Sequence, residues 1–135
     1  MTRKIITKNV SRENYRSYRG KALQFYGVMN ICLQDREWDA VLLNGVHASI
    51  SMCDALTVFH AGKHSKSAHH RDAALLLAES IPSDKNINKN VQRLCEIIDE
   101  KNLIEYQPKR FQEQEAFSFA LKVERFFEWA KALLP

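Results

Sequence analysis

The sequence predicts an all-α protein, an up-and-down helical bundle of four long helices plus a shorter fifth. Apolar residues recur at steps of three and four residues through most of the chain, as they do on one face of an α-helix. No stretch shows convincing alternation of apolar and polar residues, and no repeat of roughly 20 to 50 residues occurs. A chain of 135 residues fits one domain, so we expect a single bundle over 1–135 whose first residues, 1–10, form a loose tail.

The first helix is expected over residues 11–33, because Ser11 is a favourable N-cap and an apolar face follows it. Gly20 and Gly27 lie in its interior, where each costs up to about 1 kcal/mol relative to Ala. We therefore expect these glycines where another helix approaches closely. The apolar positions of this face are Tyr15, Tyr18, Ala22, Phe25, Tyr26, Met29, Cys32 and Leu33.

The central helix is expected over residues 39–61, because this stretch is apolar on nearly every side and such a helix is normally buried. Gly62 suits the left-handed position that ends a helix. Four polar residues interrupt the apolar sequence at steps of three, four and three, which places them in one stripe. Either they hydrogen-bond within the core, or they support a polar cleft between helices. These residues are Asn44, His47, Ser51 and Asp54.

Three further helices complete the predicted bundle. Ser67 can cap the first of them, and Pro82 ends it. The last is rich in aromatic residues on one broad stripe, so we expect it to lie across the bundle. The predicted ranges are 68–81, then 83 or 84 to 102, a connection over 103–110, and 112–134.

Composition limits the classes of protein that this chain can be. No apolar run approaches the roughly 20 residues of a membrane-spanning helix, and no signal-peptide core occurs, so we expect a soluble cytoplasmic protein without membrane contact. The three cysteines form no CxxC pair, which favours reduced core residues over disulfides or a thiolate zinc site. The net charge is +4, and most of the excess precedes Trp38. This basic part either attracts a polyanion or is a solvated surface.

The polar loop GKHSKSAHHRD, residues 62–72, holds the densest chemistry of the chain. Three functions compete with the simple interpretation of a solvated loop. His60 and His64 have the spacing of helical metal ligands, but no acidic ligand accompanies them, and we expect no metal site. The loop also leads into a helix N-terminus, where an anion binds favourably. Finally, a histidine beside a cation can transfer protons at a phosphate, as metal-free RNA cleavage requires.

Residues 40–79 resemble the core of the HEPN family (higher eukaryotes and prokaryotes nucleotide-binding domain). The resemblance consists of a helix with His47 and then Asp54-Ala-Leu, a Gly-basic-Ser loop over 62–65, and the pattern His70-x-x-Ala-x-x-Leu-Leu. The aromatic-rich last helix is also similar to that of family members. The resemblance covers roughly residues 39–134, and its central part is the more specific.

The resemblance implies a helical bundle that pairs as a symmetric homodimer, with the basic loops of two subunits meeting at one cleft. Many members are metal-independent ribonucleases of toxin, antiviral or RNA-processing systems, and others are inactive partners of small nucleotidyltransferases. The family's catalytic signature is an Arg followed a few residues later by His. Here the basic residues before His70 are Lys63 and His64, and no Arg lies between Arg36 and Arg71.

We therefore expect a cleft that binds a nucleotide or an RNA phosphate without a cofactor. His70 would act as general acid or base, and Lys63, with His64 beside it, would stabilise the phosphorane. Asp54 or His47 would orient the catalytic group. The alternative is a catalytically inactive interaction module for a nucleotidyltransferase or antitoxin partner. The residues expected to bind substrate are Lys66, Arg71, Ser51, Asn44 and His69.

Overall fold

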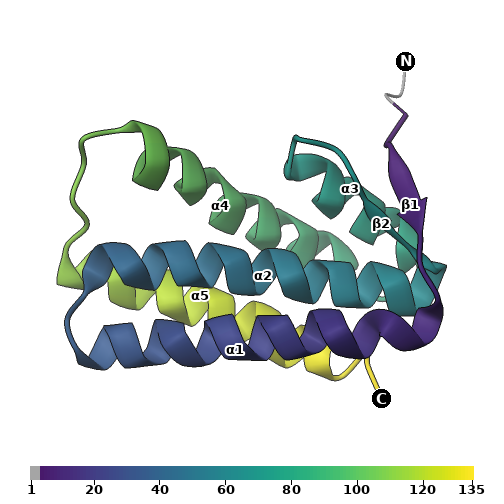
Figure 1. Cartoon of the computed structure of the whole chain (residues 1–135), viewed down its shortest axis with the longest axis horizontal. Helices are drawn as coiled ribbons and strands as arrows, with labels where there is room; N and C mark the ends of the chain where they lie inside the picture. The colour runs from purple at the N-terminus through teal and green to yellow at the C-terminus, as the bar shows by residue number, and fades with distance from the viewer. Residues whose placement is uncertain (1–3) are drawn as a thin grey trace.

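The computed structural model describes residues 4–135 and is predominantly helical, as predicted, with five α-helices and a small two-stranded sheet (Figure 1). The helices are assembled around α2, which contacts each of the other four. The elements are β1 (Thr7–Asn9), the 3-10 helix η1 (Arg12–Asn14), α1 (Tyr15–Gln34), α2 (Trp38–Ala61), β2 (Lys63–Ser65), α3 (Arg71–Ser80), α4 (Ile87–Tyr106) and α5 (Glu113–Lys131).

The sheet is the main departure from the predicted architecture. β1 pairs with β2 in antiparallel register, with Lys8 opposite His64. A hydrogen bond from the Lys66 N–H to the Ile6 carbonyl, 2.8 Å long, extends the pairing at one end. The prediction of a loose tail is therefore wrong for residues 7–9, while residues 1–3 of that tail lie outside the described part of the chain. Strands of three residues are too short to show alternation, which explains why the sequence did not reveal them.

Several helix boundaries also differ from the predictions, and two of them bear on the candidate site. The third helix begins at Arg71 rather than at residue 68, because residues 68–70 form a turn in which the Ser67 hydroxyl accepts from the His69 N–H at 3.1 Å. The fourth helix continues to Tyr106 instead of ending near residue 102. Gly62 is confirmed as the left-handed residue after α2, with φ of 67°. These shifts matter because the start of α3 and the end of α4 form the candidate site described below.

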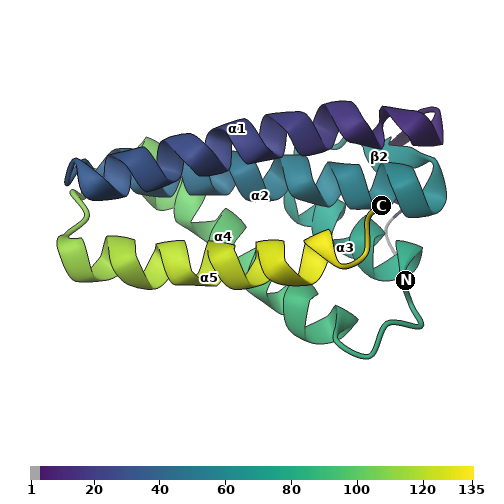
Figure 2. The same ribbon diagram turned by 90° about the horizontal axis from the view of Figure 1, so that it is seen from below.

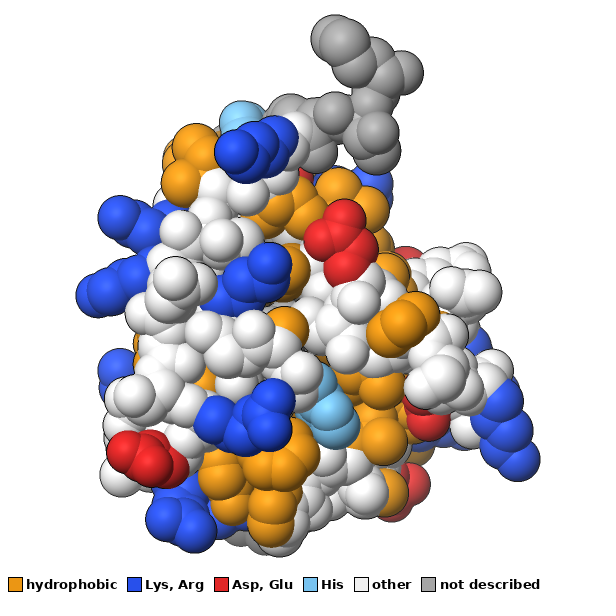
Figure 3. All heavy atoms as spheres, turned by 90° about the vertical axis from the view of Figure 1, so that its right-hand side faces the viewer, with side chains coloured by type: hydrophobic (Ala, Val, Ile, Leu, Met, Phe, Trp, Pro, Cys, Tyr) orange, Lys and Arg blue, Asp and Glu red, His pale blue; other side chains and the backbone are white. Residues whose placement is uncertain are grey.

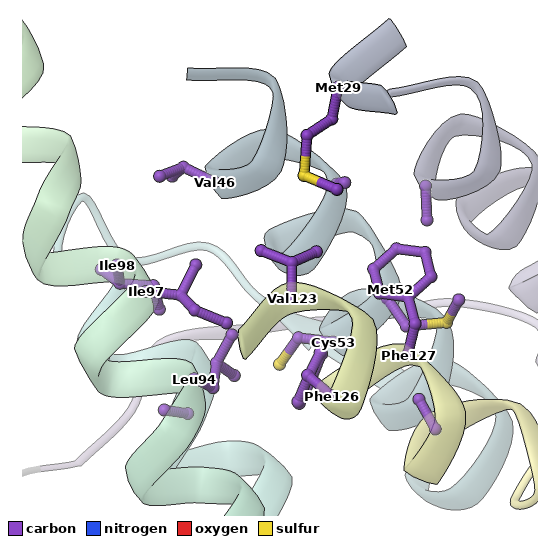
Figure 4. Packing of buried hydrophobic residues seen from close by; sticks show 14 of the residues in the cluster. Met29, Val46, Met52, Cys53, Leu94, Ile97, Ile98, Val123, Phe126 and Phe127 are labelled. Carbon is purple, nitrogen blue, oxygen red and sulfur yellow. The ribbon is translucent and has the colours of Figure 1, made fainter. Parts of the chain in front are cut away.

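The core lies between α2, α4 and α5, with α1 closing one side (Figures 2 and 4). Phe126 and Phe127 of α5 are buried there, and the Phe127 ring stacks on Tyr26 of α1 with ring centroids 4.5 Å apart. Aromatic side chains bury more apolar area than most other residues do. This stacked pair therefore holds α5 against α1. Other side chains of the cluster are Met29, Val46, Met52, Cys53, Leu94, Ile97, Ile98 and Val123.

The length and composition of α2 would allow it to cross a membrane, with a mean hydropathy of 1.3 over its most apolar window. This corrects the expectation that no apolar run reaches such a length. However, 67% of that window is buried inside the protein, as in the core helix of a soluble protein. The apolar character of α2 is therefore accounted for by its central place in the bundle.

The two glycines in the interior of α1 do not mark a close helix contact. A Cβ atom placed on Gly20 or Gly27 meets no other atom of the described residues within 4 Å. Both glycines are exposed, so the prediction that a neighbouring helix of this chain packs against them is wrong. The close approach occurs instead at Gly45 of α2, where a Cβ would overlap the Phe119 ring.

Replacing Ser49 by Ala is expected to raise the free energy of unfolding by about 1 kcal/mol. Ser49 is 0% exposed, and its hydroxyl has no hydrogen-bond partner among the described residues. Folding therefore removes the hydroxyl from water without compensation, and Ala also favours the helix slightly. Urea denaturation measures the difference. Ser80→Ala is the matched control, because the Ser80 hydroxyl donates to the Leu76 carbonyl at 2.7 Å and its removal should give no gain. A loss of stability in Ser49→Ala would contradict the prediction.

Candidate functional site

A cleft of about 280 Å³ lies between the start of α3 and the C-terminal half of α4. It brings together residues that are far apart in the sequence, since α3 and α4 pack against each other. Three of the predicted site residues, His69, His70 and Arg71, line it. The other lining residues are Ala68, Ile98, Asp99, Lys101, Asn102 and Tyr106.

His70 immediately precedes α3 and is half-buried in this cleft. Burial lowers the pKa of its imidazole below 6.5, and the nearby charges of Lys101 and His47 lower it further, although Glu105 acts in the opposite direction. The neutral imidazole is therefore the favoured form near neutral pH. A neutral, partly exposed imidazole can accept a proton, as a general base must.

His47 of the α2 polar stripe lies close to this cleft. Its charge affects the pKa of both His70 and Glu105, which places it near groups from α3 and α4. On its other side its ring lies against Phe25 of α1, with centroids 5.6 Å apart. His47 is thus held between α1 and the cleft.

Lys101 provides a cation in the cleft that the sequence did not single out. Its ammonium group is 2.9 Å from a Glu105 carboxylate oxygen, and this bond lowers the Glu105 pKa. The Tyr106 hydroxyl also donates to Glu105. The only sequence signal was the i,i+4 spacing of Lys101 and Glu105, which requires α4 to extend beyond residue 102. Because the predicted helix ended at residue 102, the sequence did not indicate this pair.

Arg71 is engaged at the rim of the cleft. Its Nε and Nη2 atoms donate to the two carboxylate oxygens of Asp99 at 3.2 and 2.8 Å. Such a bidentate pair occupies one full edge of the guanidinium group. A substrate phosphate would have to compete with Asp99 for that edge, so Arg71 holds α3 to α4 in the described structure.

The residues of β2, and Lys66 just after it, lie outside the lining of the His70 cleft. Lys63, His64 and Lys66 are absent from its lining. Pairing with β1 fixes the backbone of this segment, and the His64 ring contacts Tyr18 of α1 with centroids 5.5 Å apart. The His64 Nδ1 is also 3.0 Å from the Ser65 carbonyl. The structure thus does not bring Lys63 and His64 to His70, although they are close in sequence.

The remaining members of the α2 polar stripe have separate surroundings. Asp54 lies beside α1, where burial raises the pKa of its carboxyl to about 7 and the charge of Lys21 partly counteracts this. Burial raises the pKa of the Tyr18 hydroxyl, and the charge of Asp54 raises it further. Asn44 donates to the Ala40 carbonyl at 2.9 Å, which satisfies it within its own helix. Ser51 is half-buried on the same stripe.

The Nε2 atom of His60 is engaged by the backbone. It donates to the Leu133 carbonyl at 2.9 Å and so ties the end of α2 to the segment after α5. Among residues 4–135, no group of three or more His, Cys, Asp or Glu side chains is arranged to hold a metal ion.

Cations gather along one edge of the end of the molecule where the sheet and the start of α1 lie (Figure 3). In α1, cations lie over aromatic rings of the same helix. Arg19 is 5.1 Å from the Tyr15 ring centroid, and Lys21 is 5.8 Å from that of Tyr18. These cation–π contacts hold the charged groups themselves close to the aromatic rings of α1.

Comparison with known proteins gives no independent assignment. No protein-family model matches the chain, and no curated protein matches it either. The function must therefore be inferred from the residues and their geometry.

Proposed function

We propose that this chain is a HEPN-like cytoplasmic protein that binds an RNA or nucleotide phosphate in the cleft between α3 and α4. The observation that carries the proposal is that half-buried His70, whose pKa burial lowers, and Lys101 line one cleft. A phosphate bound there would meet the proton acceptor together with the Lys101 ammonium, for which it would compete with the Glu105 carboxylate. A proton acceptor and a positive charge are both needed for metal-independent cleavage of RNA.

The cleavage reaction follows from these two groups. His70 takes the proton of the 2′-hydroxyl, and the resulting oxygen attacks the adjacent phosphorus. Lys101 stabilises the negative charge of the phosphorane, the role that the sequence assigned to Lys63. The imidazolium formed on His70 then returns its proton to the leaving 5′-oxygen, so the 5′-bond breaks and a cyclic phosphate remains. His47 orients His70 during these steps.

We also propose that two copies pair with their clefts side by side, as the HEPN resemblance implies. Exposed apolar side chains on the elements that form the cleft support this pairing. Leu75 of α3 is 50% exposed and Tyr106 of α4 is 72% exposed. A second copy would remove these side chains from water and exclude solvent from the phosphate.

A second candidate function is a catalytically inactive interaction module with a nucleotidyltransferase or antitoxin partner. Two observations favour it. No arginine precedes His70 at the position of the HEPN signature, and the Arg71 guanidinium that follows His70 is engaged by Asp99. Lysine retains the charge of arginine but lacks the planar fork that binds two phosphate oxygens.

Incubation of a mixed RNA pool with the protein and EDTA tests the first function. Wild type is expected to cleave the RNA, and His70→Ala is expected to lower the rate by about 100-fold or more, because proton transfer contributes at least this much. Lys101→Ala should also slow cleavage. His64→Ala is the matched control, since His64 lies on β2 outside the cleft and its loss should leave the rate unchanged.

The outcomes separate the two functions. Cleavage that survives in His70→Ala would overturn the assigned mechanism. If wild type binds RNA without cleaving it, the proposed phosphate site is supported and the proposed catalytic step is contradicted. If wild type neither binds nor cleaves RNA, the interaction module replaces the first proposal, and co-purification with a partner becomes the next measurement.

A further inference from the structure

A second cleft, of about 570 Å³, lies between the N-terminal half of α4 and the C-terminal half of α5. The two helices cross at an angle in Figure 2. This cleft shares no lining residue with the His70 cleft. Along α4, Asn90 of the second cleft and Asp99 of the first are about 13 Å apart, given the rise of an α-helix. The second cleft is therefore a separate feature of the surface.

The charge of this cleft is predominantly positive. Lys89, Arg93 and Arg125 line it, and the carboxylate of Glu128 is the one acidic group among its lining residues. Lys89 and Arg125 are exposed, and neither makes a salt bridge with a residue of the described range 4–135. Unpaired cations on facing helices favour an anionic ligand between them.

Arg93 is held in place by a buried amide. Asn90 is 2% exposed, and its Nδ2 donates to the Asn86 carbonyl at 3.0 Å. Its Oδ1 accepts from Arg93 Nη1 at 2.7 Å. The amide fixes the guanidinium without neutralising it, so the other N–H groups of Arg93 remain able to donate to a phosphate. A fixed arginine loses less entropy on binding than a mobile one.

Trp129 provides a flat aromatic wall in the same cleft. Its Nε1 donates to Asp84 Oδ2 at 2.9 Å, and the same oxygen accepts from the Asn86 N–H at 3.0 Å. The indole ring is therefore anchored by the segment that precedes α4, while part of it stays exposed. Aromatic rings beside cations are the surfaces on which nucleic-acid bases stack.

We propose that this second cleft binds a nucleoside phosphate. Arg93, Arg125 and Lys89 bind the phosphate, and the base stacks on Trp129. Glu128 accepts a hydrogen bond from a ribose hydroxyl or from an amino group of the base. The ligand is either a free nucleotide or one nucleotide of an RNA strand, since both present the same groups. The proposal does not depend on catalysis in the His70 cleft.

Tryptophan fluorescence provides the test, because the chain has two tryptophans, Trp38 and Trp129. In a Trp38→Phe background, the emission reports on Trp129 alone. AMP, ADP, ATP and a short single-stranded RNA are titrated in turn, and inorganic pyrophosphate is titrated as a probe without a base. We expect nucleotides to quench the emission. Pyrophosphate should not quench it but should compete with the nucleotides.

Arg125→Ala is expected to weaken nucleotide binding by about tenfold or more, as for the loss of a charge-assisted phosphate contact. Arg16→Ala is the matched control, since it removes the same charge from the exposed surface of α1 and should leave the affinity unchanged. Circular dichroism establishes that the variants keep their helices. Tighter binding of the RNA than of any mononucleotide would identify the strand as the ligand, and the reverse order would identify a free nucleotide.

Two results would overturn the proposal. One is the absence of quenching by every nucleotide and by the RNA. The other is an equal loss of affinity in Arg16→Ala and Arg125→Ala, which would reveal attraction by overall charge alone. Neither result bears on cleavage by His70, so the two proposals fail or stand separately.

Discussion

Asp54→Asn is expected to stabilise the protein at pH 8 by up to about 4 kcal/mol, while leaving its stability near pH 4 almost unchanged. Burial beside α1 raises the pKa of the Asp54 carboxyl from 3.8 to about 7 in the folded protein. Above that pH the folded protein carries a poorly solvated carboxylate. Asn has nearly the same shape and no charge, so it removes this cost.

The direction of the pH dependence follows from the two pKa values. Below pH 3.8 the carboxyl is protonated in both the folded and the unfolded chain, and it contributes no difference. Between pH 3.8 and about 7 the unfolded chain is ionised but the folded one is not. The free energy of unfolding therefore falls by up to about 1.4 kcal/mol for each pH unit. Above this window the loss is complete.

Urea denaturation of wild type and Asp54→Asn at pH 4, 5.5, 7 and 8 measures the effect. Glu79→Gln is the control, because Glu79 is exposed on α3 and its loss should change stability by less than about 0.5 kcal/mol at each pH. A stability difference between wild type and Asp54→Asn that is the same at every pH would show that the carboxyl is not buried as described. Lys21→Met should extend this loss of stability to higher pH and enlarge its total, because the Lys21 charge lowers the Asp54 pKa.

The helices were predictable because their signals are local. The apolar sequence of α2 indicated a central buried helix, and Gly62 marked its end. The pairing of β1 with β2 was not predictable, because two three-residue segments more than fifty residues apart in sequence carry no periodic signal. The end of α4 was placed too early because residues such as Leu103 and Tyr106 are compatible with a helix or a loop before Pro108.

The candidate site was predictable only in part, for a related reason. Sequence spacing placed His69 and His70 beside a helix N-terminus, and both line the cleft. It could not show that α4 brings Lys101 to the same place, since that depends on how two helices pack. Nor could it show that strand pairing directs His64 toward Tyr18. Residues adjacent in a loop are poor guides to a site when a sheet separates their side chains.

Gly45→Ala is expected to lower the free energy of unfolding by about 2 kcal/mol, although Ala favours a helix more than Gly does. Gly45 lies where α2 meets both α1 and α5. A Cβ atom there would overlap the Phe119 ring and would lie 3.0 Å from the Met29 sulfur. Met29 is flexible, but Phe119 is only 5% exposed and its ring is enclosed by the core. The overlap therefore outweighs the gain in helix propensity, which is about 1 kcal/mol.

Gly20→Ala separates these two contributions, because a Cβ at Gly20 meets no described atom within 4 Å. This exposed substitution should stabilise the protein by up to about 1 kcal/mol, so the two glycine variants are expected to change stability in opposite directions. Thermal or urea denaturation of both variants measures the difference. Phe119→Leu in the Gly45→Ala background should recover part of the loss, as a smaller side chain makes room for the methyl group. If Gly45→Ala were as stable as Gly20→Ala, the Phe119 ring of α5 would have to lie farther from α2 than described.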